Sequence, residues 1–175
     1  PIKRFMPIET RRRTIWACIG LIALAVLVTF GPLVRASFTD WDDPDTIWAN
    51  PHLRPATLVS ISHYWTHSAG ELYIPLTYSV WGGLAHLGHS VEPNGAIGPA
   101  AMPFHAANII IHLLCAIVAF LILARLVPSM WAACAGALIF ALHPLQTEPI
   151  AWASGMKDLL GALLTLMARW EYVIW

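Results

Sequence analysis

Charged side chains are scarce in this sequence. Asp, Glu, Lys and Arg together account for 11% of its 175 residues, whereas soluble globular domains carry about 25%. Hydrophobic residues account for 58%, which excludes a disordered chain and leaves too little polar surface for a soluble domain. The ten basic and ten acidic residues cancel, so there is no positive excess for binding nucleic acid. The composition therefore predicts an integral membrane protein that is surrounded by lipids and has no nucleic-acid partner.

Cysteine is also rare. Cys18, Cys115 and Cys134 are the only three, each lies in an apolar stretch, and no Cys-x-x-Cys pair exists. An odd number of cysteines in apolar segments argues against a disulfide framework, and the missing spacing argues against a zinc site. We expect all three to be small buried side chains.

The first apolar run, residues 15–34, contains no charged residue. About 20 residues at 1.5 Å rise cross the ~30 Å of a bilayer core. We predict a retained span rather than a cleaved signal peptide, because the run is long and no small-x-small cleavage site precedes Asp40. Basic residues precede the span, so the positive-inside rule places residues 1–14 in the cytoplasm. These basic residues are Lys3, Arg4, Arg11, Arg12 and Arg13.

Three more apolar stretches follow. Residues 104–126 make a full second span. Residues 130–143 are short for a third, so this span must tilt or include part of the polar segment that follows. Residues 159–175 are a candidate fourth span that Arg169 and Glu171 interrupt. The expected fold is an all-α membrane helical bundle with three or four transmembrane helices, whose last span is truncated.

Two polar segments, residues 35–103 and 144–158, should face the same extracytoplasmic compartment. The first is expected to contain interfacial helices at residues 75–89, anchored by Tyr78 and Trp81, and at residues 53–65. The stretch that follows, residues 91–103, is rich in Gly and Pro and is predicted to be loop.

The densest polar cluster directly follows the first span. It contains four carboxylates, on Asp40, Asp42, Asp43 and Asp45. Neighbouring carboxylates at a low-dielectric boundary repel one another, which favours proton uptake by one of them and makes it a candidate general base. Two alternatives stay open. Clustered oxygens suit a divalent cation, and Asp-Pro-Asp also suits the capped start of a solvated helix.

A second polar cluster includes Glu148, Lys157 and Asp158. An ionisable group at membrane depth, such as Glu148, is a functional candidate by default, although interfacial snorkelling and helix capping are equally simple explanations. Lys157 and Asp158 fit an ion pair at a helix start, where the macrodipole favours the aspartate.

Polar side chains also lie inside the second span. His105 and His112 are seven residues apart and therefore share one helix face, with Asn108 between them. Two turns separate the imidazoles by about 10 Å, too far to ligate one iron, so we favour a polar packing seam over a haem or pigment site.

Four segments, in this order, resemble one family. They are TDWDDPDTIWANPHLRP, ELYIPLTYS, PFHAANIIIHLLCAIVAFLILARL and LIFALHPLQTEPIAWASGMKDLL. They resemble the N-terminal part of membrane glycosyltransferases of the GT-C class, within the family of transmembrane proteins with C-terminal tetratricopeptide repeats that includes O-mannosyltransferases. The resemblance covers roughly residues 15–167.

The resemblance implies a chemistry. GT-C enzymes transfer a sugar from a polyprenyl-phosphate donor with inversion, and an acid of the first outer loop acts as base. The catalytic residues that this implies are Asp42 and Asp43, either of which could be the base, and Glu148 as a second outer acid. The implied substrate-binding residues are Lys157, Arg54 and Asp158. The lipid-linked sugar is a substrate, no residue is assigned to a metal, and a divalent ion stays open as a cofactor.

Two hypotheses follow. The chain is the N-terminal portion of such an enzyme, or it is a shortened, non-catalytic subunit of a larger membrane complex, in the cell inner membrane or the endoplasmic reticulum. Family members carry more spans and then repeats, so a complete chain of this length would favour the subunit and a fragment would favour the enzyme. Small residues offer an interface for a partner. They are Ala106, Ala107, Ala116, Ala132, Ala133, Ala135, Gly136 and Ala137.

Overall fold

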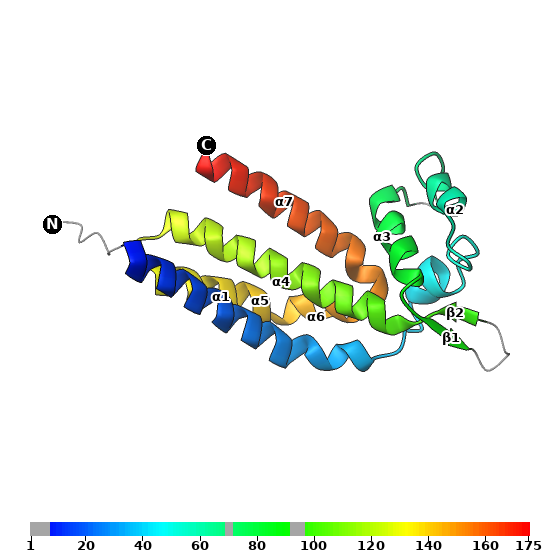
Figure 1. Ribbon diagram of the computed structural model, residues 1–175, viewed down its shortest axis with the longest axis horizontal. Coiled ribbons are helices and arrows are strands. Elements are labelled where there is room, and N and C mark those ends of the chain that lie inside the picture. Colours follow the sequence, from blue (N-terminus) through cyan, green and yellow to red (C-terminus); the bar gives the residue numbers. More distant parts are fainter. Residues whose placement is uncertain (1–7, 69–71, 92–96) are drawn as a thin grey trace.

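The computed structural model describes residues 8–68, 72–91 and 97–175. Long helices lie side by side, with α4 (Ala101–Leu126) in contact with each of the others (Figure 1). The helices α1 (Ile8–Phe30) and α5 (Met130–Leu142) pack on α4 and on each other, and α7 (Met156–Ile174) also packs on α4. The chain is therefore an all-α membrane helical bundle, as the composition predicts.

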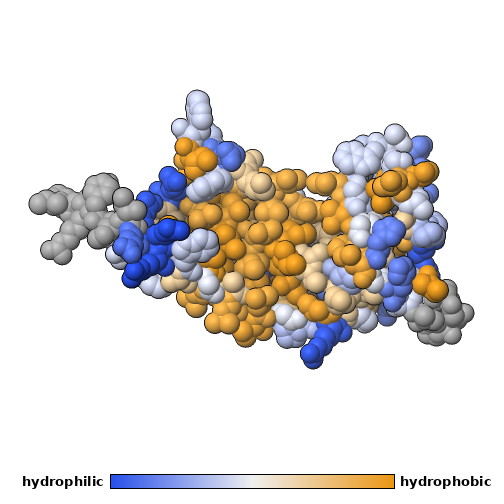
Figure 2. Space-filling model, viewed as in Figure 1, coloured by the Kyte–Doolittle hydropathy of each residue, from blue (hydrophilic) through white to orange (hydrophobic). Residues whose placement is uncertain are grey.

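On the face seen in Figure 2, apolar side chains cover the bundle between two more polar ends. Among the described residues, two helical segments are long and apolar enough to cross a membrane. One is Glu9–Arg35, in which η1 (Gly31–Arg35) continues α1, and the other is α4. Both extend the expected spans by a few residues. The early basic residues Lys3 and Arg4 lie outside the described residues.

A third crossing requires two helices together. The helix α5 has 13 residues, well short of the ~20 needed. It becomes long enough only with residues Pro144–Ala151, after a bend of 50°. The helix α7 has 19 residues, but it carries charged side chains near both ends and does not qualify as a span by apolarity. A fourth crossing therefore stays a prediction.

Buried side chains, several of them small, pack α1 against α5 in the interior of the bundle. Cys18, Ile22 and Val26 of α1 are fully buried, as are Ala133 and Ala137 of α5, and α1 packs directly on α5. All three cysteines are buried and free. Much of the small-residue interface that the sequence offers to a partner is thus already used within this chain, because small side chains let its own helices approach closely.

The polar face of α4 ties three segments to the bundle. His105 Nε2 lies 3.3 Å from the carbonyl oxygen of Ser37, and His112 Nε2 lies 2.9 Å from that of Ala141. Asn108, between them, donates to Trp152. All three side chains are buried, so the structure places them in a packing seam.

A smaller head lies beyond one end of the bundle, opposite the chain termini (Figure 1). It contains η2 (Pro44–Trp48), α2 (Leu58–His63) and α3 (Pro75–Ala85), with a hairpin of β1 (His89–Val91) and β2 (Ile97–Pro99). Thr57 and Ser60 cap the start of α2 reciprocally, which satisfies backbone donors that the helix leaves unpaired. The helix α2 is thus shorter than the expected helix over residues 53–65.

Two expectations for the head are wrong. Residues 91–103 are not simply loop, because β2 pairs with β1 and α4 already begins at Ala101. Gly and Pro signal a turn locally, but they do not report that the flanking residues pair, and Pro103 fits the first turn of a helix. The helix α3 also ends at Ala85, four residues earlier than expected.

Tyr78 and Trp81 do not anchor the head in the membrane interface. Their side chains are 2% and 0% exposed, because they form the core of the head. Tyr64 stacks on Tyr78 with 3.9 Å between ring centroids, and its hydroxyl donates to Asn50 Oδ1 at 2.7 Å. Burial raises the pKa of both tyrosines, so the rings stay neutral.

Candidate active site

The segment between α5 and α7 builds one wall of the site. The sequence predicts an extracytoplasmic loop over residues 144–158, and in the structure this segment forms three short helical turns and the start of α7. The turns are η3 (Pro144–Gln146), α6 (Thr147–Ala151) and η4 (Ala153–Gly155). Pro144 occupies the first position of η3, where its missing N–H costs nothing, and the Nδ1 atom of His143 accepts from Leu145 N at 3.2 Å.

Asp43 is fully buried and fastens this segment to the end of the first span. Its Oδ1 accepts from Ser154 N at 2.8 Å. Its Oδ2 accepts from Thr39 N at 2.9 Å, from Thr39 Oγ1 at 3.0 Å and from Ala153 N at 3.4 Å. Both oxygens are thus engaged by donors within the protein, so the arrangement supports a structural role for this carboxylate.

Asp42 faces the opposite way, into a pocket of about 270 Å³. Its side chain is 45% exposed, and its Oδ2 lies 3.9 Å from Lys157 Nζ. Glu148 and Asp158 line the same pocket, together with Trp152. Four of the six candidate residues therefore meet here, from the acidic turn, α6 and the start of α7.

Two aromatic rings stand beside this pocket. Trp41, next to Asp42 in sequence, is 73% exposed, and its ring centroid lies 6.4 Å from that of Trp152. Sequence reasoning did not single out either residue. Trp152 is more than a hundred positions away from Trp41 in the sequence. No local pattern could therefore have shown that the two rings lie beside the same pocket.

Comparison with known proteins adds to this geometry. The chain is 29% identical to "Protein O-mannosyl-transferase TMTC1" of Mus musculus over 161 residues, which is 87% of this chain, and 29% identical to "Protein O-mannosyl-transferase Tmtc2" of Drosophila melanogaster over 89% of it. Over 39% of the chain, it is 40% identical to TMTC1 of Homo sapiens. The chain is thus similar in sequence to TMTC protein O-mannosyl-transferases.

The chain spans only part of these TMTC relatives. The alignments cover 16% of the mouse protein, 16% of the fly protein and 8% of the human protein. No protein-family model and no solved structure matches the sequence. The similarity to the mouse and fly proteins thus extends over most of this chain but over a small part of each relative.

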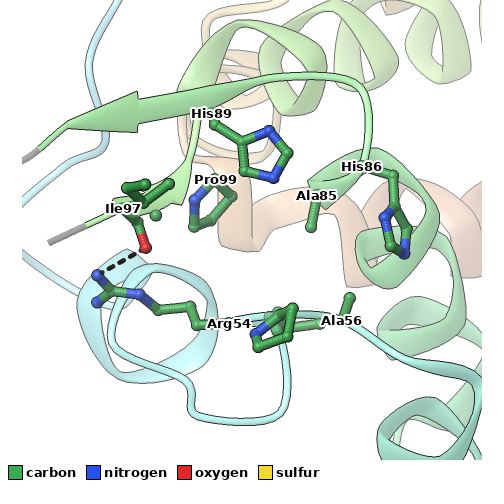
Figure 3. Close-up of a pocket in the computed structure, with 10 residues that line it drawn as sticks. Arg54, Ala56, Ala85, His86, His89, Ile97 and Pro99 are labelled. Atoms are coloured by element: carbon green, nitrogen blue, oxygen red, sulfur yellow. Dashed lines mark hydrogen bonds between the residues drawn. The ribbon is translucent and has the colours of Figure 1, made fainter.

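Arg54, which the TMTC resemblance offers as a phosphate contact, lies in a different place. Its guanidinium donates to the carbonyl oxygens of Trp48 at 3.1 Å and Ile97 at 3.3 Å. Figure 3 shows the separate cavity that it lines, with His86 and His89 on the other side. The structure thus assigns Arg54 to the head, where it joins η2 to β2, and not to the Asp42 pocket.

A divalent cation finds no ready ligand set. Within residues 8–68, 72–91 and 97–175, no group of three or more His, Cys, Asp or Glu side chains is arranged to hold a metal ion. Both oxygens of Asp43 already accept hydrogen bonds from protein donors, and a divalent ion as a cofactor stays an open alternative.

Gly155 lets two parts of the pocket wall, α6 and η4, pack closely on each other. A Cβ atom at this position would lie 2.4 Å from the carbonyl oxygen of Pro149 and 2.7 Å from its Cα. Such contacts are with backbone, so they cannot be relieved by a side-chain rotation. The close approach of η4 to α6 therefore requires glycine here.

We expect Gly155→Ala to destabilise the protein by about 1–3 kcal/mol, because the added methyl group must push α6 away from η4. The measurement is thermal unfolding in detergent. Gly161→Ala is the matched control, since nothing lies within 4 Å of a Cβ atom there, and this change should be neutral or slightly stabilising in a helix. Equal effects of the two substitutions would contradict the close-approach argument.

Proposed function

We propose that this chain forms the acidic part of the active site of an inverting GT-C glycosyltransferase that uses a polyprenyl-phosphate sugar. The observation that carries the proposal is the meeting of Asp42 and Lys157 in one pocket, with 3.9 Å between Oδ2 and Nζ. An acid and a base side by side, with open access, provide both charges that such a transfer needs. The similarity to proteins known as protein O-mannosyl-transferases supports mannose as the sugar and a protein hydroxyl as the acceptor.

Asp42 is the general base in this proposal. A base must be within hydrogen-bond reach of the acceptor proton, and the half-exposed carboxylate of Asp42 satisfies this requirement. Asp43 does not, because it is 0% exposed. In the transfer, Asp42 takes the proton from the acceptor hydroxyl while that oxygen forms a bond to the anomeric carbon from the face opposite the leaving group.

Lys157 stabilises the leaving group. The bond between the anomeric carbon and the phosphate oxygen breaks, and the polyprenyl phosphate departs with the electron pair. A nearby ammonium group stabilises the charge that develops on that oxygen. Lys157 lies in the first turn of α7, where the positive end of the helix macrodipole adds to the same effect. Glu148 and Asp158, at the pocket wall, orient the acceptor by accepting hydrogen bonds from it.

The proposal includes a sidedness. The exposed residues Arg11, Arg12 and Arg13 lie at the start of α1, and the blue surface at that end of the bundle in Figure 2 lies opposite the head. With this end in the cytoplasm, the pocket opens on the other side of the membrane, in the lumen of the endoplasmic reticulum or outside the cell inner membrane. A lipid-linked donor in the outer leaflet would reach it there.

The test is a transfer assay on membranes from cells that produce the protein from its natural gene. Labelled mannose on a polyprenyl phosphate should pass to a Ser- or Thr-containing peptide, with inversion at the anomeric carbon. Transfer directly from a nucleotide sugar, or retention of configuration, would overturn the proposal. Recovery of the protein at fixed stoichiometry with other membrane subunits, without any transfer, would favour the accessory-subunit hypothesis.

Lys157→Gln should slow this transfer by about 10²-fold, the usual effect of removing one preorganised charge-stabilising group. The loss should appear in kcat, since the group acts most strongly on the developing charge, and Lys157→Arg should recover part of it. Arg169→Gln, on the exposed far end of α7, is the control and should leave the rate unchanged. A Lys157→Gln variant with the natural rate would remove Lys157 from the mechanism.

A further inference from the structure

Asn108 makes contacts that the proposed mechanism does not use. It lies on α4 and is 0% exposed. Its Nδ2 lies 2.7 Å from the carbonyl oxygen of Trp152, 3.4 Å from that of Ile150 and 3.5 Å from that of Pro149. The Nδ2 group of one buried amide thus lies within reach of three carbonyl oxygens at the end of α6, in the segment that forms the pocket wall.

The same segment is held from a second direction. Asp43 accepts from the backbone N–H groups of Ala153 and Ser154, whereas Asn108 donates to carbonyls just before them. The segment between α5 and α7 is therefore fastened through its carbonyls to the second span and through its amides to the acidic turn. Trp152 and Gly155 of this segment line the pocket, and Lys157 follows directly.

We propose that Asn108 is a positioning residue, which places Lys157 and the pocket wall relative to Asp42 by holding the backbone of residues 149–152. The inference rests on the proposed transfer for its functional meaning, but the positioning itself is a property of the fold. Misplacing a catalytic group by about 1 Å can cost about 10²-fold in rate, so a buried amide far from the reacting atoms can control the reaction.

Stability alone does not explain an amide at this position. The Oδ1 atom of Asn108 is buried with no hydrogen-bond partner among the described residues, and a buried polar atom without a partner costs free energy. The carbonyl of Trp152 also accepts from Gly155 N at 3.0 Å, so it would stay paired without Asn108. The unpaired Oδ1 of Asn108 therefore costs stability, whereas its Nδ2 fixes the position of the pocket-wall backbone.

His112 provides a matched control. It lies one turn further along the same buried face of α4, and its Nε2 likewise contacts a carbonyl, that of Ala141 at 2.9 Å. Ala141 belongs to α5 and not to the pocket wall. His112→Ala should thus cost a similar interhelical hydrogen bond while leaving the pocket segment in place.

The experiment compares Asn108→Ala with His112→Ala in the protein produced from its natural gene. The readouts are kcat and KM for lipid-linked mannose, the unfolding temperature, and amide hydrogen exchange of residues 153–157. We expect Asn108→Ala to lower kcat by about 10- to 100-fold and to speed exchange in 153–157 by at least about tenfold, at an unfolding temperature similar to that of His112→Ala. His112→Ala should keep kcat and the exchange pattern in this segment.

Equal changes in kcat and in local exchange for the two variants would overturn the inference. If Asn108→Ala does not accumulate, two other variants replace it. Asn108→Asp is nearly isosteric but loses the donor, and Asn108→Gln keeps the donor. The Gln variant should then retain more activity and slower exchange than the Asp variant. Loss of protection in 153–157 in a protein without any transfer activity would support the positioning and contradict the proposed function. If transfer depends on Asp42 but Asn108→Ala keeps normal protection in 153–157, the proposed function would be supported and the positioning role contradicted.

Discussion

Replacing Asp42 by asparagine is expected to reduce sugar transfer by about 10²- to 10⁴-fold, the range that general-base catalysis contributes. Asparagine has nearly the same shape, but its amide cannot take the proton of the acceptor hydroxyl. The side chain is 45% exposed, so the substitution should leave the fold intact. The measurement is the initial rate of transfer from lipid-linked mannose, together with an unfolding temperature within about 2 °C of the natural protein.

Asp45→Asn is the control for this prediction. Asp45 belongs to the same acidic turn and is exposed, but it does not line the pocket. The change removes the same charge from the same turn, so a general electrostatic effect of the cluster would slow both variants equally. Transfer at the natural rate by the Asp42 variant would mean that another group is the base.

Replacing Asp43 by alanine should have the largest effect on stability, a loss of about 3–5 kcal/mol. The carboxylate accepts four hydrogen bonds, three of them from backbone N–H groups. Without it, the N–H groups of Thr39, Ala153 and Ser154 are left in a buried site with no acceptor, and each such group costs about 1–3 kcal/mol. Thermal unfolding in detergent, followed by tryptophan fluorescence, measures the loss.

Thr39→Val separates the contribution of the Thr39 hydroxyl from that of the backbone N–H donors to Asp43. It removes only the hydroxyl donor at 3.0 Å and should cost about 1 kcal/mol. The structural role assigned to Asp43 would be wrong if its alanine variant unfolded at the natural temperature and lost only activity. That result would make Asp43, and not Asp42, the base.

The two long spans could be predicted from local sequence because a membrane imposes a local rule. A helix in lipid satisfies all its backbone groups internally, so an uninterrupted apolar run of sufficient length is enough to predict it. The helix α4 covers the predicted residues 104–126, and α1 together with η1 covers the predicted residues 15–34. The helix α5 is the informative exception, because its 13 residues need the bent extension to Ala151.

Features that depend on distant contacts escaped prediction. In the head, Tyr64 stacks on Tyr78, and the ring of Tyr78 packs edge-on against Trp81. No local pattern reports that an aromatic residue faces a protein core instead of the membrane interface. The hairpin of β1 and β2 was missed for a similar reason, as pairing depends on both strands. The sequence likewise does not report that the guanidinium of Arg54 donates to backbone carbonyls of η2 and β2, and its implied phosphate contact stays a prediction.

The sequence by itself determined that this is a membrane helical bundle and which carboxylates and lysine are candidates for the site, because composition and motif order are local properties. Only the tertiary structure distinguishes the surroundings of Asp42 and Asp43. The two side chains are chemically identical neighbours, but one is half exposed beside Lys157 and the other is buried among backbone donors. Neither difference is visible in the local sequence, because it arises from η4 and the start of α7, which are more than a hundred residues further along the chain.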